Sequence, residues 1–318
     1  MNAPVKPDLE NATALENPKK TNDAGRPQGS ASPDDLEIVP RNRRFGREDT
    51  KKRWWMKDDP VGTAFYNALS VTFPKGEAYF IESVKAFRDG TPERLNREIR
   101  AFVKQEINHT REHVAFNRAV TDAGYDVSRL EEKVDEALAM TKGRPAIANL
   151  ASTMALEHFT AIIAQQLIAN PRHLADADKE SGDMWRWHAL EEIEHKGVAY
   201  DTWLHATRDW SRWQRWKVKS LVMLLTTWYF TVNRAKGMMD LLAQDGITGW
   251  KAGAKLFWYA FGRPGMARKI ILPWISYFLP GFHPWNHDDR HLIKLAESDY
   301  QDAVMPGADN SAAVQPAE

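Results

Sequence analysis

The chain has 318 residues, 43% of them hydrophobic, with 43 acidic and 43 basic residues that give a formal net charge of zero. This length and hydrophobic content allow one sizeable core or two small ones, and the balanced charge argues against nucleic acid as a partner. The absence of cysteine excludes disulfides, thiolate zinc sites, iron–sulfur clusters and cysteine catalysis, so any metal must be held by His, Asp or Glu.

The two ends of the chain are predicted to be disordered tails. Residues 1–36 are rich in Pro, Asn, Asp, Lys, Ser and Gly, and residues 303–318 have a similar composition. The first residues lack the apolar stretch of a signal peptide, and no apolar run reaches the length of a membrane span, which favours a cytoplasmic location. Residues 37–302 are predicted to form a single helical domain with a Trp-rich C-terminal extension.

Helix-length amphipathic segments separated by short Gly and Pro breaks predict an all-α fold. Pro92 suits a first helical turn, and Gly124 suits the position that follows a helix end. The pattern places helices at 62–73, 75–89, 92–122, 128–140, 145–169, 176–207, 212–235, 247–260 and 266–278.

Two of the predicted helices carry a Glu-x-x-His motif on one face. In the third helix Glu106 and His109 share a stripe, and in the sixth helix His188, Glu192 and His195 do so. Metal-binding four-helix bundles use Glu-x-x-His on two helices and a lone Glu on each of two others to hold two ions. The two motifs therefore predict a metal site between helices.

Two further helices are expected to supply one glutamate each from an apolar face. In the fifth helix Glu157 lies among Leu, Met, Ala and Ile, where a carboxylate is costly to bury unless it is paired or metal-bound, and where small neighbours leave room for a ligand. In the second helix Glu77 lies on the side of Phe80 and Val84, whereas Glu82 points about 140° away. Glu77 is therefore the predicted ligand and Glu82 is predicted to be solvated.

Other polar residues near these motifs are open to more than one interpretation. His113 and Glu191 are each a candidate for an additional ligand or for a residue that contacts a ligand from outside. Glu194 points away from the ligand stripe and is predicted to be surface charge. His158 is predicted to be structural or to contact a ligand from outside. The loop 280–289, PGFHPWNHDD, is interpreted as a packing anchor, with a cap near the metal as the alternative.

Two later segments are unusually apolar. Ser220–Val232 is flanked by Lys and Arg, and Ile271–Trp285 is rich in aromatic residues and broken by proline. The favoured interpretation is buried core helices and a packed C-terminal segment. The alternative is peripheral contact with the inner face of a membrane, with basic residues and Trp at the interface.

The chain resembles a bacterial family of predicted metal-dependent hydrolases in the stretches NALSVTFPKGEAYFIESV, KQEINHTREHVAFN, MALEHFT, WHALEEIEHKGVAYD and PGFHPWNHDD. The resemblance extends from about Ile38 to Tyr300 and implies a ferritin-like four-helix bundle with additional C-terminal helices. The form H-x-x-x-E-x-x-H is also similar to that of di-iron arylamine N-oxygenases, whose ligand set includes an extra histidine. On that resemblance, His188 is an additional ligand beside Glu192 and His195.

The predicted metal ligands are Glu77, Glu106, His109, Glu157, His188, Glu192 and His195. This carboxylate-rich set suits two iron ions, with manganese or zinc as alternatives. Because carboxylate-rich di-iron bundles typically activate dioxygen, the leading hypothesis is a non-haem di-iron oxygenase. Its substrate would be a hydrophobic, lipid-like small molecule, and its electrons would come from a separate donor, since no dinucleotide motif is visible.

Two alternative functions stay open at this point. The first is a metal-dependent hydrolase that uses a metal-bound hydroxide as nucleophile. The second is non-enzymatic metal binding or storage. No residue is assigned a catalytic role other than metal binding. A homodimer is a further expectation, and no sequence feature distinguishes it from a monomer.

Overall fold

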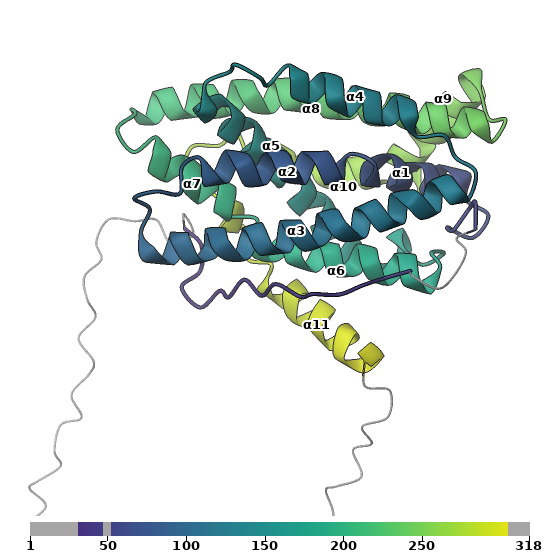
Figure 1. The fold of residues 1–318 in the computed structure, drawn as a ribbon, viewed down its shortest axis with the longest axis horizontal. Coiled ribbons are helices and arrows are strands. Elements are labelled where there is room, and N and C mark those ends of the chain that lie inside the picture. Colours follow the sequence, from purple (N-terminus) through teal and green to yellow (C-terminus); the bar gives the residue numbers. More distant parts are fainter. Residues whose placement is uncertain (1–30, 47–51, 305–318) are drawn as a thin grey trace, which may run out of the picture.

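The computed structural model describes residues 31–46 and 52–304, and these residues form an all-α fold, as the sequence predicts (Figure 1). The helices are α1 (Pro60–Ser70), α2 (Phe73–Lys85), α3 (Glu93–Asp122), α4 (Ser128–Ala139), α5 (Ala146–Ala169), α6 (Lys179–His195), α7 (Val198–Ala206), α8 (Arg212–Gln244), α9 (Gly249–Phe257), α10 (Met266–Ser276) and α11 (Arg290–Val304). Three short turns are η1 (Pro171–His173), η2 (Trp258–Gly262) and η3 (Pro284–Asn286). The predicted tails lie largely outside the described residues.

The helix predicted over residues 176–207 is in fact two helices, α6 and α7, which are separated at Lys196 and Gly197. A Cβ atom added at Gly197 would lie 2.6 Å from Ser32 Oγ and 3.0 Å from Trp285 Cδ1. Two segments distant in the sequence therefore pack directly against the backbone at this point. Helical periodicity carries no information about such contacts, which explains why the break was not predicted.

The C-terminal half of the chain contains more helix than the sequence pattern predicts. α8 continues past the predicted end at residue 235, because Met238, Leu241 and Leu242 are buried and their packing outweighs the poor helix propensity of the intervening glycine. α11 was not predicted. It is a polar helix in which Leu292 is buried against the rest of the molecule.

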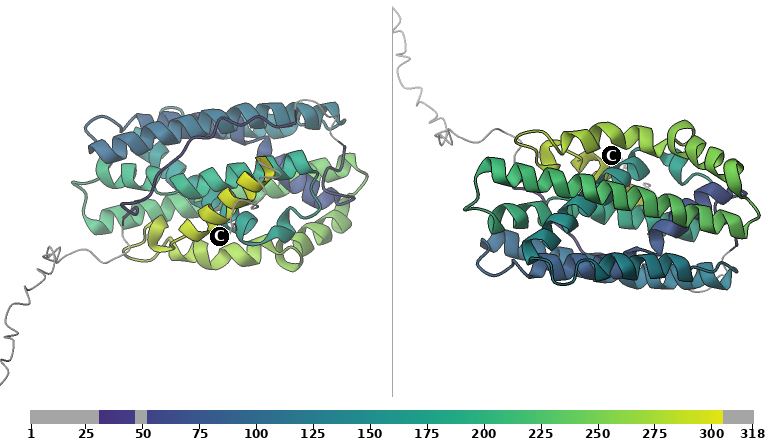
Figure 2. Two further views of the ribbon diagram at one scale, coloured as in Figure 1. Left: turned by 90° about the horizontal axis from the view of Figure 1, so that it is seen from below. Right: turned by 90° about the horizontal axis from the view of Figure 1, so that it is seen from above.

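Four helices, α2, α3, α5 and α6, surround the centre of the molecule (Figure 1). α5 is apolar on all sides, consistent with a position among the other helices. By length and composition it is the one helix in the described residues that could span a membrane, and 67% of its apolar window is buried within the protein. The N-terminal segment, residues 31–46, runs along the outside of α3 and α6 (Figure 2).

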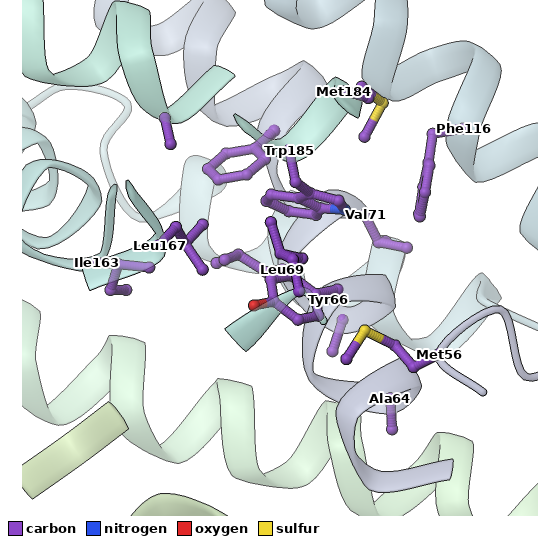
Figure 3. Close-up of a cluster of buried hydrophobic side chains, with 14 of the residues drawn as sticks. Met56, Ala64, Tyr66, Leu69, Val71, Phe116, Ile163, Leu167, Met184 and Trp185 are labelled. Atoms are coloured by element: carbon purple, nitrogen blue, oxygen red, sulfur yellow. The ribbon is translucent and has the colours of Figure 1, made fainter. Parts of the chain in front are cut away.

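Two hydrophobic clusters lie on either side of a polar layer. One includes Tyr66, Leu69, Phe116, Ile163, Leu167 and Trp185 (Figure 3), and the other includes Phe80, Ile99, Phe102, Leu150, Met154 and Trp203. Along α3, Phe102 belongs to one cluster and Phe116 to the other, and the polar residues between them include Glu106 and His109. On α2, Glu77 likewise lies between Phe73 of one cluster and Phe80 of the other. The polar residues of α2 and α3 therefore lie between two apolar layers.

The prediction that the apolar segments are buried core is wrong for their outer faces. On α8, Leu221 and Trp228 are 59% and 68% exposed, and Leu224 and Leu225 are exposed as well. On α10, Leu272 is 75% exposed. The opposite faces of both helices do pack against α5. The helices are therefore two-sided, with one apolar face in the core and another on the surface.

Candidate metal centre

Each of four helices places one glutamate in the polar layer, and all four are buried: Glu77 from α2, Glu106 from α3, Glu157 from α5 and Glu192 from α6. The imidazole of His195 brings three of them together. Its Nε2 atom lies 3.2 Å from Glu106 Oε1 and 3.4 Å from Glu157 Oε2. The same atom lies 3.5 Å from Glu192 Oε2. Residues separated by about ninety positions in the sequence thus converge on one point.

His109 and His188 lie beside the same carboxylates. His109 Nδ1 is 3.9 Å from Glu106 Oε1 and 3.6 Å from Glu192 Oε1. His188 Nε2 is 2.9 Å from Glu192 Oε1. The two imidazole rings stack, with their centroids 4.1 Å apart. The predicted extra histidine therefore lies within the cluster rather than at its edge.

The potential ligand atoms fall into overlapping groups. Oxygen and nitrogen atoms of Glu106, Glu192 and His195 all lie within 4.8 Å of one another, and so do those of Glu77, Glu106 and His109. Two further groups consist of His109, His188 and Glu192, and of Glu77, His113 and His188. Glu77, Glu106 and Glu192 each belong to two of these groups. A carboxylate shared by two groups is the arrangement expected where two ions are bridged.

The hydrogen bonding of these residues fits a bound metal. In the described part of the chain, both carboxylate oxygens of Glu106 and of Glu157 are buried without a hydrogen-bond partner, as are His109 Nδ1, His188 Nε2 and His195 Nε2. An unpaired buried polar group costs about 1–3 kcal/mol, and so many in one place call for a ligand. Two divalent cations would also neutralise the four carboxylate charges.

Burial has opposite effects on the two kinds of ligand. It raises the pKa of Glu77 and Glu106 well above the ordinary range for glutamate and raises that of Glu157 to about 7. It lowers the pKa of His109 well below the usual value. Metal binding requires ionised carboxylates and neutral imidazoles. Burial therefore favours a neutral His109, whereas the adjacent carboxylates of Glu192 and Glu157 raise the pKa of His195 well above its usual value. A cation would take the place of that proton and supply the charge that the buried carboxylates need.

Glu191 contacts a ligand from outside the cluster. Its Oε2 atom lies 3.0 Å from His109 Nε2, on the side of the ring opposite the Nδ1 atom that faces Glu106. The backbone N–H of Arg41 donates to Glu191 Oε1 at 2.7 Å. The two atoms lie at ion-pair distance without the geometry of a hydrogen bond, and a small rotation of the ring would let His109 donate to Glu191 as metal-binding histidines usually donate to a carboxylate. Of the two interpretations of Glu191, the geometry favours a supporting contact.

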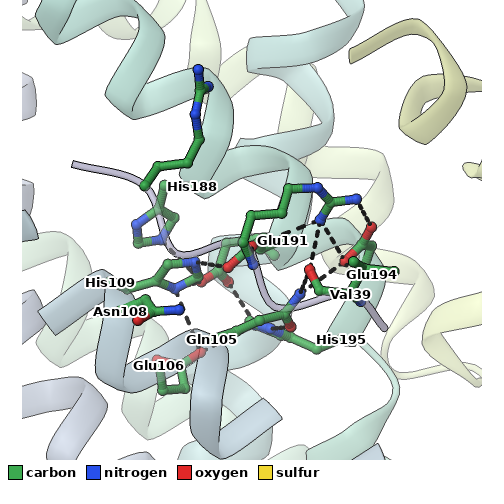
Figure 4. Close-up of polar contacts among 12 residues, drawn as sticks. Val39, Gln105, Glu106, Asn108, His109, His188, Glu191, Glu194 and His195 are labelled. Carbon is green, nitrogen blue, oxygen red and sulfur yellow. Dashed lines mark hydrogen bonds and ion pairs between the residues drawn. The ribbon is translucent and has the colours of Figure 1, made fainter. Parts of the chain in front are cut away.

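A second supporting chain reaches His195 and includes residues that the sequence did not indicate (Figure 4). His195 Nδ1 lies 2.9 Å from Gln105 Oε1, and Gln105 Nε2 donates to Glu194 Oε2 at 2.8 Å. The guanidinium of Arg41 donates to both Glu194 oxygens, at 3.0 Å and 2.7 Å. The prediction of Glu194 as surface charge is wrong, because the N-terminal segment covers it and leaves it 1% exposed.

His113 and His158 do not occupy equivalent positions. His113 Nε2 lies 2.7 Å from His188 Nδ1, and its own Nδ1 lies 2.8 Å from Ser70 Oγ. His113 thus contacts the His188 ring, and with Glu77 and His188 it also forms a group of potential ligands, so the structure is compatible with both of its predicted roles. His158 contacts the carbonyl oxygen of Pro273 at 3.2 Å, in agreement with the structural role predicted for it.

The loop 280–289 forms polar contacts away from the ligand cluster. His283 Nε2 lies 3.0 Å from Asp201 Oδ1, and Lys196 Nζ donates to Asp289 Oδ2 at 2.5 Å. The phenylalanine and tryptophan of the loop are both buried. These contacts support its interpretation as a packing anchor.

Comparison with known proteins adds a family assignment. Neither a curated protein nor a solved structure matches the chain. Residues 39–288 match the family model described as predicted metal-dependent hydrolase, and this stretch contains every candidate ligand. Because the match covers most of the sequence, the chain belongs to the predicted metal-dependent hydrolase family.

Proposed function

We propose that the protein is an enzyme with a dinuclear non-haem iron centre that activates dioxygen on a hydrophobic organic substrate. The observation that carries this proposal is the convergence of four buried glutamates and three histidines whose ligand atoms lack other partners. A carboxylate-rich set of this kind suits iron or manganese better than a three-histidine zinc site. Di-iron carboxylate bundles present the same combination of ligands.

Each residue of the centre has a distinct task in this proposal. The ions would be held by the four glutamates and by His109, His188 and His195. The bound ions would supply the redox chemistry. Glu191 and Gln105 would hold the two imidazoles in the orientation that directs a nitrogen atom into the site. The apolar layers on both sides would limit the access of bulk water.

A small cavity beside the centre has room for a reactant. It has a volume of about 20 Å³, and His188, Glu192 and Ala164 are among the residues that line it. A cavity of about 10–15 Å³ is enough for one water molecule. Dioxygen is of similar size, and the other lining residues are mostly apolar. Electrons would come from an external donor protein, because no dinucleotide-binding motif is visible in the sequence.

The description of the family favours a second candidate function, a metal-dependent hydrolysis in which water is the nucleophile. Oxygen dependence separates the two functions. We expect protein loaded anaerobically with ferrous iron to consume about one dioxygen per pair of ions and to give the Mössbauer spectrum of a coupled ferric pair. Absence of oxygen consumption, together with anaerobic cleavage of ester or phosphoester substrates by the zinc or manganese form, would establish the hydrolase instead. Uptake of many irons per chain would indicate storage.

A further inference from the structure

A groove with a volume of about 990 Å³ lies between α2, α4, α5 and α8. Figure 1 shows α4 and α8 next to each other, with α2 along the same side of the molecule. The groove is lined mainly by apolar side chains, among them Phe80, Leu130, Val134, Leu156, Leu225 and Met239. Pockets for small organic ligands typically measure about 300–1,000 Å³ and have walls of this kind.

The groove lies next to the small cavity of the metal centre. Phe73, Thr160 and Phe230 line both spaces. His188 and Glu192 also line the small cavity. A molecule in the groove can therefore contact residues that also line the cavity beside two candidate metal ligands.

Arg234 lines this apolar groove and forms no ion pair with another described residue. The Nε and Nη1 atoms of Arg234 are buried and have no hydrogen-bond partner among the described residues. Its guanidinium carbon lies 5.9 Å from the centre of the Phe230 ring. Burial lowers the pKa of Arg234 to about 10, so the group is positively charged at neutral pH. A buried charge without a partner is costly to keep.

The other charges of the groove do not compensate Arg234. Asp240 is the one carboxylate among the lining residues, and its Oδ1 atom lies 2.7 Å from Arg129 Nη1. Lys133, which also lines the groove, forms its ion pair with Glu136. The residues that line the groove thus carry an excess of positive charge. Two nitrogen atoms of Arg234 carry part of that charge in a buried position.

We propose that the groove binds an organic anion with a long apolar body, whose carboxylate or phosphate group pairs with Arg234. Arginine presents its N–H groups in a fork that matches either anion. Phe230 precedes Arg234 by one helical turn, which is a rise of about 6 Å along α8. The anionic end would therefore lie close to the boundary with the metal-side cavity. As a consequence that rests on the proposed function, this amphipathic anion is the substrate class of the metal centre.

Binding of three ligands with the same alkyl chain to the full-length protein tests the proposal: dodecanoate, dodecyl phosphate and the neutral dodecanol. We expect the wild-type protein to prefer one or both anions over dodecanol. Arg234→Met should weaken anion binding by about 10- to 100-fold, the loss expected for a charge-assisted hydrogen bond, and should leave dodecanol binding unchanged. Lys236→Met, an exposed position in the same groove, is the matched control and should bind all three ligands like the wild type.

Arg234→Lys retains the positive charge and should keep part of the preference for anions, which separates loss of charge from loss of fold. Equal binding of dodecanoate, dodecyl phosphate and dodecanol by the wild type, or unchanged anion binding by Arg234→Met, would overturn the proposal. Metal content measured in the same samples keeps the two proposals distinct. A protein that binds the anion without metal would refute the metal centre alone, and one that holds two metals without anion selectivity would refute the groove alone.

A separate observation concerns the outer surface of α8, α9 and α10, which lie next to one another in Figure 2. Large apolar side chains are exposed along all three elements and the turn between them: Leu221, Leu224, Trp228, Trp250, Phe257, Trp258, Leu272, Ile275 and Leu279. Exposed apolar surface on this scale marks a contact site on most soluble proteins. We call these residues the apolar face.

The charge around the apolar face is strongly positive, although the whole chain is neutral. Residues 212–279 contain eleven Lys and Arg but two acidic residues, Asp240 and Asp245. Both aspartates are paired with arginines from other segments, Arg129 and Arg53. Basic residues and tryptophans around exposed leucines are typical of surfaces that bind anionic membranes.

We infer that the apolar face binds the surface of an anionic lipid bilayer. Vesicles that contain phosphatidylglycerol should sediment the wild-type protein, less so at high salt, whereas pure phosphatidylcholine vesicles should not. The double variant Leu224→Glu, Trp228→Glu should lose this binding. The control variant Ile107→Glu, Val114→Glu alters two exposed positions of α3 and should retain it.

Failure of the wild-type protein to bind phosphatidylglycerol vesicles would overturn the inference. A dimer in lipid-free buffer that dissociates in the Leu224→Glu, Trp228→Glu variant would overturn it as well, because the apolar face would then belong to a contact between two copies of the chain. Sedimentation velocity distinguishes the monomer from the dimer.

Discussion

Arg41 links the outer surface of the protein to two histidines of the metal centre. Its backbone N–H holds Glu191, which contacts His109, and its guanidinium holds Glu194, which accepts from the Gln105 side chain. Both glutamates are buried, so the positive charge of Arg41 compensates two carboxylates at once. A single residue outside the ligand set therefore influences how the imidazoles face the metal.

Substitution of Arg41 by Met should destabilise the protein by about 3–5 kcal/mol, the cost of leaving a buried carboxylate without its partner. Metal affinity should also fall, by about 10- to 100-fold, because the supports of two imidazoles are disturbed. Urea unfolding of metal-free protein measures the first effect and metal titration the second. Arg97→Met is the matched control, since Arg97 pairs with Glu93 at the surface, and it should cost about 1 kcal/mol or less.

His173 provides a test of the pH dependence of stability away from the metal centre. Its side chain is buried, and burial lowers its pKa to about 4 from the 6.5 of an exposed histidine. The unfolded chain therefore binds a proton that the folded protein excludes. The contribution of His173 to the free energy of unfolding should be complete above pH 6.5. It should decrease as the pH falls toward 4, by up to about 3 kcal/mol.

The variant His173→Gln cannot take up this proton, so its stability should depend less on pH between 6.5 and 4 than that of the wild type. The same substitution at the exposed His291 should leave the pH profile unchanged. Urea midpoints measured across this range give the comparison. Parallel profiles for wild type and His173→Gln would contradict the burial of a neutral imidazole.

At the scale of the elements, helical periodicity predicted which faces are buried. Glu77 and Glu157 lie on the apolar sides of α2 and α5, and Glu82 is exposed, as their positions in the sequence suggested. The repeated Glu-x-x-His spacing was informative because two residues one turn apart share a face. These patterns are local, and they depend on the geometry of a single helix.

The parts that could not be predicted depend on contacts between distant segments. Glu194 is buried because residues 31–46, which form no helix, cross over α6. Gln105 acquires its role only when α3 meets α6. The break between α6 and α7 occurs where Trp285 packs against Gly197. No pattern within one helix contains this information.

Gly197→Ala tests the packing at this break. An added methyl group would lie 2.6 Å from Ser32 Oγ and 3.0 Å from Trp285 Cδ1, so we expect a loss of about 1–3 kcal/mol from overpacking. Gly253→Ala in α9 meets nothing within 4 Å and should stabilise the protein by about 0.5–1 kcal/mol through its better helix propensity. Thermal unfolding of the two variants should therefore shift in opposite directions, and a shift of the same sign would contradict this explanation.

For the whole molecule, the proposed metal ions would complete the polar layer between two hydrophobic clusters. Removal of the ions leaves the buried carboxylates next to one another with no cation to compensate their charge. The metal-free protein should therefore be less stable. Each ion present at 100 times its Kd should contribute about 2.7 kcal/mol. For a chain of this size, we expect chelation to lower the Tm by roughly 10 °C.

Calorimetry with and without a chelator measures this effect in the wild type. The variant Glu106→Ala, which lacks a ligand shared by two groups, should show a much smaller change on chelation. An identical decrease in Tm for both proteins would show that the chelated metal is bound elsewhere.

Metal stoichiometry tests the central claim most directly. Wild-type protein and Glu82→Ala, which alters an exposed glutamate of α2, should each bind two metal ions per chain. Glu106→Ala and Glu192→Ala should each fail to retain two, because both glutamates are shared between the ligand groups. Two ions per chain in both of these variants would contradict a metal centre between α2, α3, α5 and α6.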